Sequence, residues 1–91
     1  MITIIQKPLF RKTYKKLHIA EKKVVDVAIK TIAKNPELGE LKKGDLAGLS
    51  VYKFKMNNQQ KLLAYTYHKT QIVLIGLGTH ENFYRNLKKN L

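Results

Sequence analysis

The residues best suited to chemistry in this chain are three lysines, a histidine and a tyrosine, all in its second half: Lys53, Lys55, Lys61, His80 and Tyr84. The imidazole can accept or donate a proton near neutral pH, because its unperturbed pKa is about 6.5. The ammonium groups can neutralise an anion, and the phenol can donate a hydrogen bond or stack on a nucleic-acid base. We therefore expect one surface to gather these side chains around an anionic ligand.

A strand predicted at Val51–Met56 positions two of the lysines. Its alternation predicts one face carrying Tyr52 and Phe54 and an opposite face carrying Lys53 and Lys55. Lysine is depleted in strands, and like charges on one face repel, so this pair of lysines needs an explanation. A bound anion would provide one. The alternative is that the lysines protect an edge strand from aggregation.

The charge balance indicates a polyanionic partner. Eighteen Lys and Arg against six Asp and Glu give a net charge of +12, far more than solubility requires in 91 residues. Nucleic acid and an acidic protein both fit this charge, and the alternative is a basic surface that is only solvated. The length predicts a single domain over residues 1–91.

The composition also predicts a cytoplasmic protein. Cysteine is absent, which excludes disulfides and thiolate metal sites. No apolar run approaches the roughly 18 residues of a membrane helix, and the opening residues do not have the pattern of a signal peptide. We expect no membrane association.

Two helices are predicted in the first half of the chain. A β-branched run at Ile2–Ile5 predicts a buried first strand, and Pro8 suits the first turn of the helix that follows it. The apolar residues of Ala20–Lys34 recur with helical spacing, and Asn35-Pro36 should end that second helix. Joined near His18, the two helices would form a hairpin that covers a sheet.

The first of these helices is predicted to be amphipathic and strongly basic. Its apolar side would carry Leu9, Phe10, Tyr14 and Leu17. The remaining surface would carry Lys7, Arg11, Lys12, Lys15 and Lys16, with no acidic residue between them. Such a helix either binds a phosphate backbone, for instance through Lys12 and Lys16, or is a solvated outer face.

The second half reads as three strands and a last helix. Glu37–Ser50 is predicted to be a loop, Asn57–Gln60 a polar hairpin turn, and Leu62–Tyr67 the next strand. Ile72–Leu77 is apolar throughout, as in a central strand, and Thr79 would cap the last helix. The predicted order is strand, helix, helix, strand, strand, strand, helix. This is an α+β domain with a helix hairpin on one face of a small, mostly antiparallel sheet.

Three short motifs give the chain a resemblance to a known group of proteins. They are Tyr52-Lys53-Phe54-Lys55, then Lys61 followed by Leu62-Leu63-Ala64-Tyr65, and finally Gly78-Thr79-His80 with Tyr84 four residues on. With the element order and size, they resemble the RelE/ParE superfamily of toxins from bacterial type II toxin-antitoxin systems, and the closing triplet resembles the end of YafQ. The resemblance covers nearly the whole chain.

The resemblance implies a ribosome-dependent mRNA endonuclease. In RelE-like ribonucleases, the RNA is cleaved by its own 2′-hydroxyl without a metal ion or cofactor. Lys53, Lys55 and Lys61 would hold the phosphate, and His80 and Tyr84 would assist proton transfer. Arg85 would be an auxiliary cation. Two departures are that Lys61 stands where many relatives have arginine, and that the turn before it is shortened.

Two other functions stay open at this point. ParE-type members share the fold but act on DNA gyrase without catalysis, and a plain basic nucleic-acid-binding module is the third possibility. Either toxin function implies a small acidic antitoxin as partner, in addition to mRNA and the ribosome or gyrase. The six acids offer no carboxylate pair, and no glycine-rich phosphate loop is present.

Overall fold

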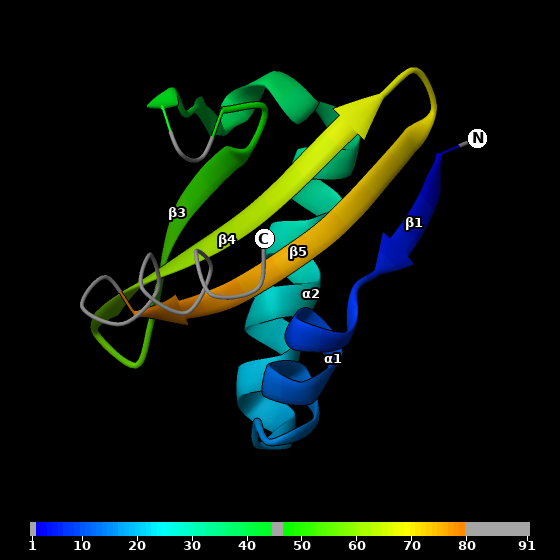
Figure 1. Cartoon of the computed structure of the whole chain (residues 1–91). Helices are drawn as coiled ribbons and strands as arrows, with labels where there is room; N and C mark the ends of the chain where they lie inside the picture. The colour runs from blue at the N-terminus through cyan, green and yellow to red at the C-terminus, as the bar shows by residue number, and fades with distance from the viewer. Residues whose placement is uncertain (1, 45–46, 80–91) are drawn as a thin grey trace.

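The computed structural model describes residues 2–44 and 47–79, and Figure 1 shows how their elements are arranged. In chain order these are β1 (Thr3–Gln6), α1 (Pro8–Lys15), α2 (Ile19–Lys34), the 3₁₀ helix η1 (Pro36–Leu38), β2 (Glu40–Leu41), β3 (Ser50–Met56), β4 (Gln59–His68) and β5 (Gln71–Thr79). The predicted order of strands and helices is confirmed up to β5. The predicted last helix lies outside the described residues.

The strands form one twisted sheet in the order β1-β5-β4-β3-β2. β1 runs parallel to β5, and the other neighbours are antiparallel. Both helices lie along the same side of this sheet (Figure 1). The predicted α+β class, with a helix hairpin on a mostly antiparallel sheet, is therefore confirmed.

The helices begin and end where their local chemistry requires. Pro8 stands in the first turn of α1, where its missing N–H costs nothing. At the start of α2, the backbone N–H of His18 donates to Glu21 Oε1 at 3.0 Å. α2 ends at Lys34, because Asn35 precedes a proline and leaves the helical region. The hairpin near His18 is thus as predicted.

The sheet has two unequal faces, which we call the helix face and the lysine face. The helix face packs against Phe10 of α1 and against α2, with Leu63, Tyr65, Ile72 and Leu74 among its buried strand residues. The lysine face is the opposite one and carries Lys53 and Lys55. It has a smaller apolar cluster of Leu49, Val51, Leu62 and Ala64, against which Leu9 and Ile75 pack.

Several sequence predictions need correction. The first strand is exposed along its whole length instead of buried, because it is an edge strand whose one neighbour among the described strands is β5. β5 continues through Gly78 and Thr79, where we predicted that it stopped. The two-residue strand β2 arises within the predicted loop, too short to leave a pattern.

Tyr65 holds the segment after α2 in place. Its ring is fully buried in the helix-face core, and its hydroxyl donates to the carbonyl oxygen of Pro36 at 2.6 Å while accepting from the N–H of Gly39 at 2.9 Å. Burial raises the pKa of the Tyr65 hydroxyl. A side chain at position 39 would clash with this hydroxyl. The contact anchors η1 to β4 and so places β2 beside β3.

We predict that Tyr65→Phe lowers the free energy of unfolding by about 1–3 kcal/mol, because the Gly39 N–H and the Pro36 carbonyl lose their partner while the ring stays. Urea denaturation followed by circular dichroism measures this. Tyr67→Phe is the matched control, since Tyr67 neighbours Tyr65 on the same face and is 41% exposed. Equal stability of both variants would contradict the anchoring role.

Candidate functional site

A two-residue turn sets the register of the hairpin that carries the candidate site. Asn57 and Asn58 both have positive φ, 55° and 63°, which Asn tolerates and a tight hairpin requires. Met56 therefore pairs with Gln59, and Lys55 pairs with Gln60. The side-chain amide of Asn57 also donates to Glu21 Oε2 at 3.0 Å, which fixes the turn to the start of α2.

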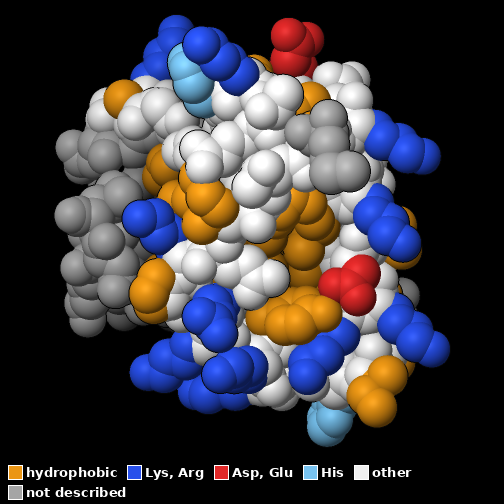
Figure 2. Space-filling model, turned by 90° about the vertical axis from the view of Figure 1, so that its right-hand side faces the viewer, with side chains coloured by type: hydrophobic (Ala, Val, Ile, Leu, Met, Phe, Trp, Pro, Cys, Tyr) orange, Lys and Arg blue, Asp and Glu red, His pale blue; other side chains and the backbone are white. Residues whose placement is uncertain are grey.

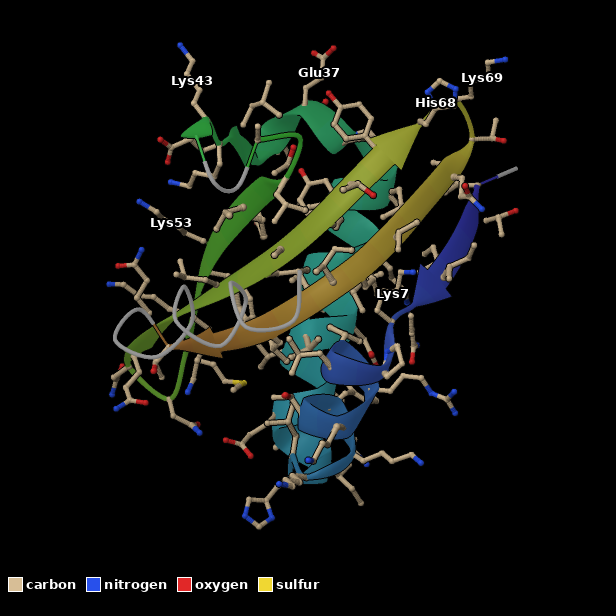
Figure 3. The ribbon with its side chains drawn as sticks, in the orientation of Figure 1. Lys7, Glu37, Lys43, Lys53, His68 and Lys69 are labelled. Carbon is tan, nitrogen blue, oxygen red and sulfur yellow. The ribbon has the colours of Figure 1, made fainter. Side chains whose placement is uncertain are left out.

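Lys53 and Lys55 form the cationic strand of the site. Both side chains are exposed on the lysine face, with their Cα atoms about 6.6 Å apart by strand geometry. Figure 3 shows Lys53 extending from β3 away from β4. Among the described residues, neither amine has an ion-pair or hydrogen-bond partner. A shallow hollow of about 300 Å³ is lined there by Lys53, Phe54, Lys55 and Gln60.

Lys61 does not share this face, contrary to the prediction that the three amines gather on one surface. It pairs with Phe54, and directly paired residues of an antiparallel ladder point to the same side. Phe54 packs against the helix-face core. The position across from Lys53 belongs instead to Leu62, which is fully buried. The cause is the pairing between the two strands, because a two-residue turn pairs Lys61 with Phe54 and a four-residue turn would pair it with Met56, and both partners belong to the helix face.

A second cationic surface lies on α1. Arg11, Lys12, Lys15 and Lys16 line, with Pro8, a hollow of about 450 Å³. In Figure 2, Lys and Arg side chains gather over the lower part of the face where α1 lies. α1 is held to α2 by the Tyr14 hydroxyl, which donates to Asp26 Oδ1 at 2.8 Å, and this hydrogen bond raises the pKa of Tyr14. Lys12 and Lys16 are therefore displayed on a fixed helix.

The two cationic surfaces flank the middle of the sheet. α1 packs against β5, whereas Lys53 and Lys55 are on β3, two strands away. β5 ends at Thr79, which pairs with Lys61, so it ends in the same row of the sheet as Phe54. His80, Tyr84 and Arg85 lie outside the described residues.

Of the two described histidines, His68 is remote from Lys53 and Lys55, whereas the backbone N–H of His18 bonds the same Glu21 carboxylate as Asn57 of the turn. His68 is at the far end of β4, six residues or about 20 Å beyond Leu62, and Figure 3 shows it next to Lys69. His18 caps α2. In the described ranges, no three His, Asp or Glu side chains are grouped so that they could hold a metal ion. Within residues 2–44 and 47–79, no helix has the length and apolar character needed to cross a membrane.

One residue of this site was missed by the sequence reasoning. Gln60 lies on the lysine face directly across from Lys55, at the hollow described above. We had assigned it to the turn. The available signal was the Asn57-Asn58 pair itself, because two consecutive residues suited to positive φ define a two-residue loop and make Gln59 and Gln60 strand residues.

The fold is that of known bacterial toxins. The chain superposes on a chain of the intact E. coli RelBE toxin–antitoxin complex with a TM-score of 0.69 and 17% identity, covering 89% of this chain and 99% of that one. A mutant of the E. coli toxin RelE in the free state superposes with a TM-score of 0.70 and 16% identity, covering 97% of this chain and 90% of that one. A chain of the YoeB–YefM toxin–antitoxin complex of Staphylococcus aureus superposes with a TM-score of 0.67 and 23% identity, covering 88% of this chain and 98% of that one. At these identities the likeness establishes the fold alone.

Sequence comparison establishes the family. Residues 4–88 match the sequence model of the ParE-like toxin of type II bacterial toxin-antitoxin systems. The chain therefore belongs to this family of toxins. A search of curated proteins finds no match.

We predict that Lys53 and Lys55 contribute nothing to the free energy of unfolding. Lys53→Gln with Lys55→Gln should leave the free energy of unfolding within about 0.5 kcal/mol of wild type, with any gain largest at low salt where like charges repel most. Urea titrations at 20 and 300 mM KCl test this. A loss of more than 1 kcal/mol would mean that the amines have structural partners.

Proposed function

We propose that this toxin is a metal-independent endoribonuclease that cleaves translated mRNA on the ribosome. The observation that carries the proposal is the pair Lys53 and Lys55, two exposed amines on one strand face without a partner among the described residues. Such charge has no role in the fold, and it suits a phosphate that becomes more negative during the reaction. A toxin of this kind acts in the cytoplasm.

The chemistry requires a proton acceptor, a proton donor and fixed positive charge. The 2′-oxygen attacks the neighbouring phosphorus as its proton is removed. The bond to the 5′-oxygen breaks as that oxygen is protonated, leaving a 2′,3′-cyclic phosphate. We assign proton transfer to His80, assisted by Tyr84, with Lys53 and Lys55 on the phosphate and Arg85 as an auxiliary cation. Thr79, which precedes His80 in the sequence, ends β5 in the row of the sheet that contains Lys61 and Phe54, and Phe54 is the neighbour of Lys55 in β3.

The surface on α1 would hold a second stretch of nucleic acid. Lys12 and Lys16 lie beside a hollow in which every charged lining residue described is cationic. Backbone phosphates of mRNA or ribosomal RNA would fit this surface without any sequence preference. We assign Lys61 no place in the lysine-face site, because its side chain starts from the opposite face.

The partner in the cell would be an acidic antitoxin that covers β3. β2 pairs only with Ser50 and Val51, so the outer edge of β3 beyond them has no neighbour among the described strands. On the helix-face side of that edge, a groove of about 290 Å³ is lined by α2 and β3, including Val27 and Tyr52. A strand with apolar side chains toward this groove and carboxylates toward Lys53 and Lys55 would fit.

A second candidate function is inhibition of DNA gyrase without catalysis. The match to ParE-like toxins favours it. The position of Lys61 on the helix face also favours gyrase inhibition, because the lysine face then has two amines instead of three and would hold an RNA phosphate less firmly. The experiment below separates the two functions.

We predict that His80→Ala reduces mRNA cleavage by about 10²-fold or more, the range usual for loss of a general acid or base. The measurement is primer extension on translated mRNA after brief expression. His68→Ala is the matched control and should cleave like wild type, since His68 is at the other end of the sheet. If expression of the wild-type toxin leaves mRNA intact and causes DNA breaks, the ribonuclease proposal is wrong and gyrase inhibition is supported.

We also predict that Val27→Glu weakens binding to the antitoxin by about 10-fold or more, because it places a carboxylate in the apolar groove on a side chain that is 63% exposed. The measurement is calorimetric titration with the protein encoded beside the toxin. Ile19→Glu is the control, as Ile19 is 74% exposed and does not line the groove. Equal affinities for both variants would exclude this surface.

A further inference from the structure

We propose that Gln60, and not Lys61, is the third RNA-binding side chain of the lysine face. In this role its neutral amide hydrogen-bonds to the ribose-phosphate backbone beside Lys55. The inference rests on the proposed ribonuclease function and assigns a binding role to a residue that no motif singles out.

The register carries the inference. Gln60 is directly across the ladder from Lys55 on the same face, and side chains in such a pair are about 5 Å apart at Cβ. The next residue of β4 on that face is Leu62, across from Lys53, and it is fully buried. Of the two β4 positions facing the lysines, Gln60 is thus the one that presents a polar group.

The surroundings leave the amide available. Gln60 is exposed, lines the hollow with Lys53 and Lys55, and has no side-chain hydrogen bond among the described residues. Asn57 of the turn does not occupy the amide of Gln60, because its own amide donates to Glu21 of α2. Gln60 therefore offers two N–H donors and one carbonyl acceptor to a ligand held by the lysines.

The chemistry differs from that of a third cation. Each amine that neutralises a phosphate displaces counterions and steepens the dependence of binding on salt, by about 0.7 in log Kd per log salt for a single strand. An amide forms hydrogen bonds but displaces no counterion. We therefore expect the salt dependence of RNA binding at the lysine face to reflect the two lysine charges. Replacing Gln60 should change the RNA affinity but not its salt dependence.

The test is a salt titration of binding to a single-stranded RNA whose riboses are 2′-O-methylated, so that it cannot be cleaved. Fluorescence anisotropy between 50 and 250 mM KCl gives the affinity and the slope for the full chain. Gln60→Ala should weaken binding about 2- to 10-fold with the slope unchanged, the range for one neutral hydrogen bond. Gln60→Arg should tighten binding and raise the slope by about 0.7.

Gln59 offers a matched control. It is the adjacent residue of the same type, is also exposed, and pairs with Met56 on the helix face. Gln59→Ala and Gln59→Arg should leave the affinity and the slope close to wild type, and Lys61→Gln should do the same. Lys53→Gln and Lys55→Gln should each lower the slope by about 0.7.

The outcomes separate this inference from the function on which it rests. If Lys53 and Lys55 variants lower the slope but Gln60 and Gln59 variants behave alike, the role of Gln60 is wrong and the RNA site stands. A slope lowered by Lys61→Gln would also overturn the inference, since it returns Lys61 to the site. If wild type shows no binding that depends on Lys53 and Lys55, the proposed function fails and this inference fails with it.

Discussion

The tight turn at Asn57-Asn58 is the constraint on which the arrangement of the candidate site depends. Because it contains two residues and no more, every position of β4 is assigned to a face by counting from it. Leu63 and Tyr65 thereby enter the helix-face core, and Gln60 joins Lys55 on the other side. The hydrophobic core enforces the same register, since a slip of one residue would move Tyr65 out of the helix-face core and onto the opposite face of the sheet. Core and site are therefore fixed by one geometric choice.

The two tyrosine contacts with the rest of the fold serve different surfaces. Tyr65 connects β4 to the segment after α2 and so determines where the sheet ends beside β3. Tyr14 connects α1 to α2 and orients the cationic helix. Both hydroxyls are bonded within the chain, so the described phenols that hold the architecture are not free to serve as proton donors. The side chains of the two cationic surfaces therefore take no part in the tyrosine hydrogen bonds that hold the helices and the sheet together.

The sequence predicted the elements well and the relation between them less well. Alternation in Val51–Met56 correctly separated Lys53 and Lys55 from Phe54, because a strand's two faces follow from local periodicity alone. The face of Lys61 follows from how β4 pairs with β3, which the periodicity within either strand does not show. The exposure of β1 depends on its place at the sheet edge, and the bonds of Tyr65 span 26 and 29 residues, so neither has a local signature.

Among the described strands, the outer edge of β1 has no neighbour, and this affects how the isolated toxin should behave. Its isoleucines are about 40% exposed, and the strand Thr3–Gln6 carries no charge to deter another strand from pairing with it. We expect mutual repulsion between molecules of charge +12 to keep copies apart. Added electrolyte weakens that repulsion, so preparations of the protein alone should cloud as ionic strength rises, the reverse of ordinary salting-in.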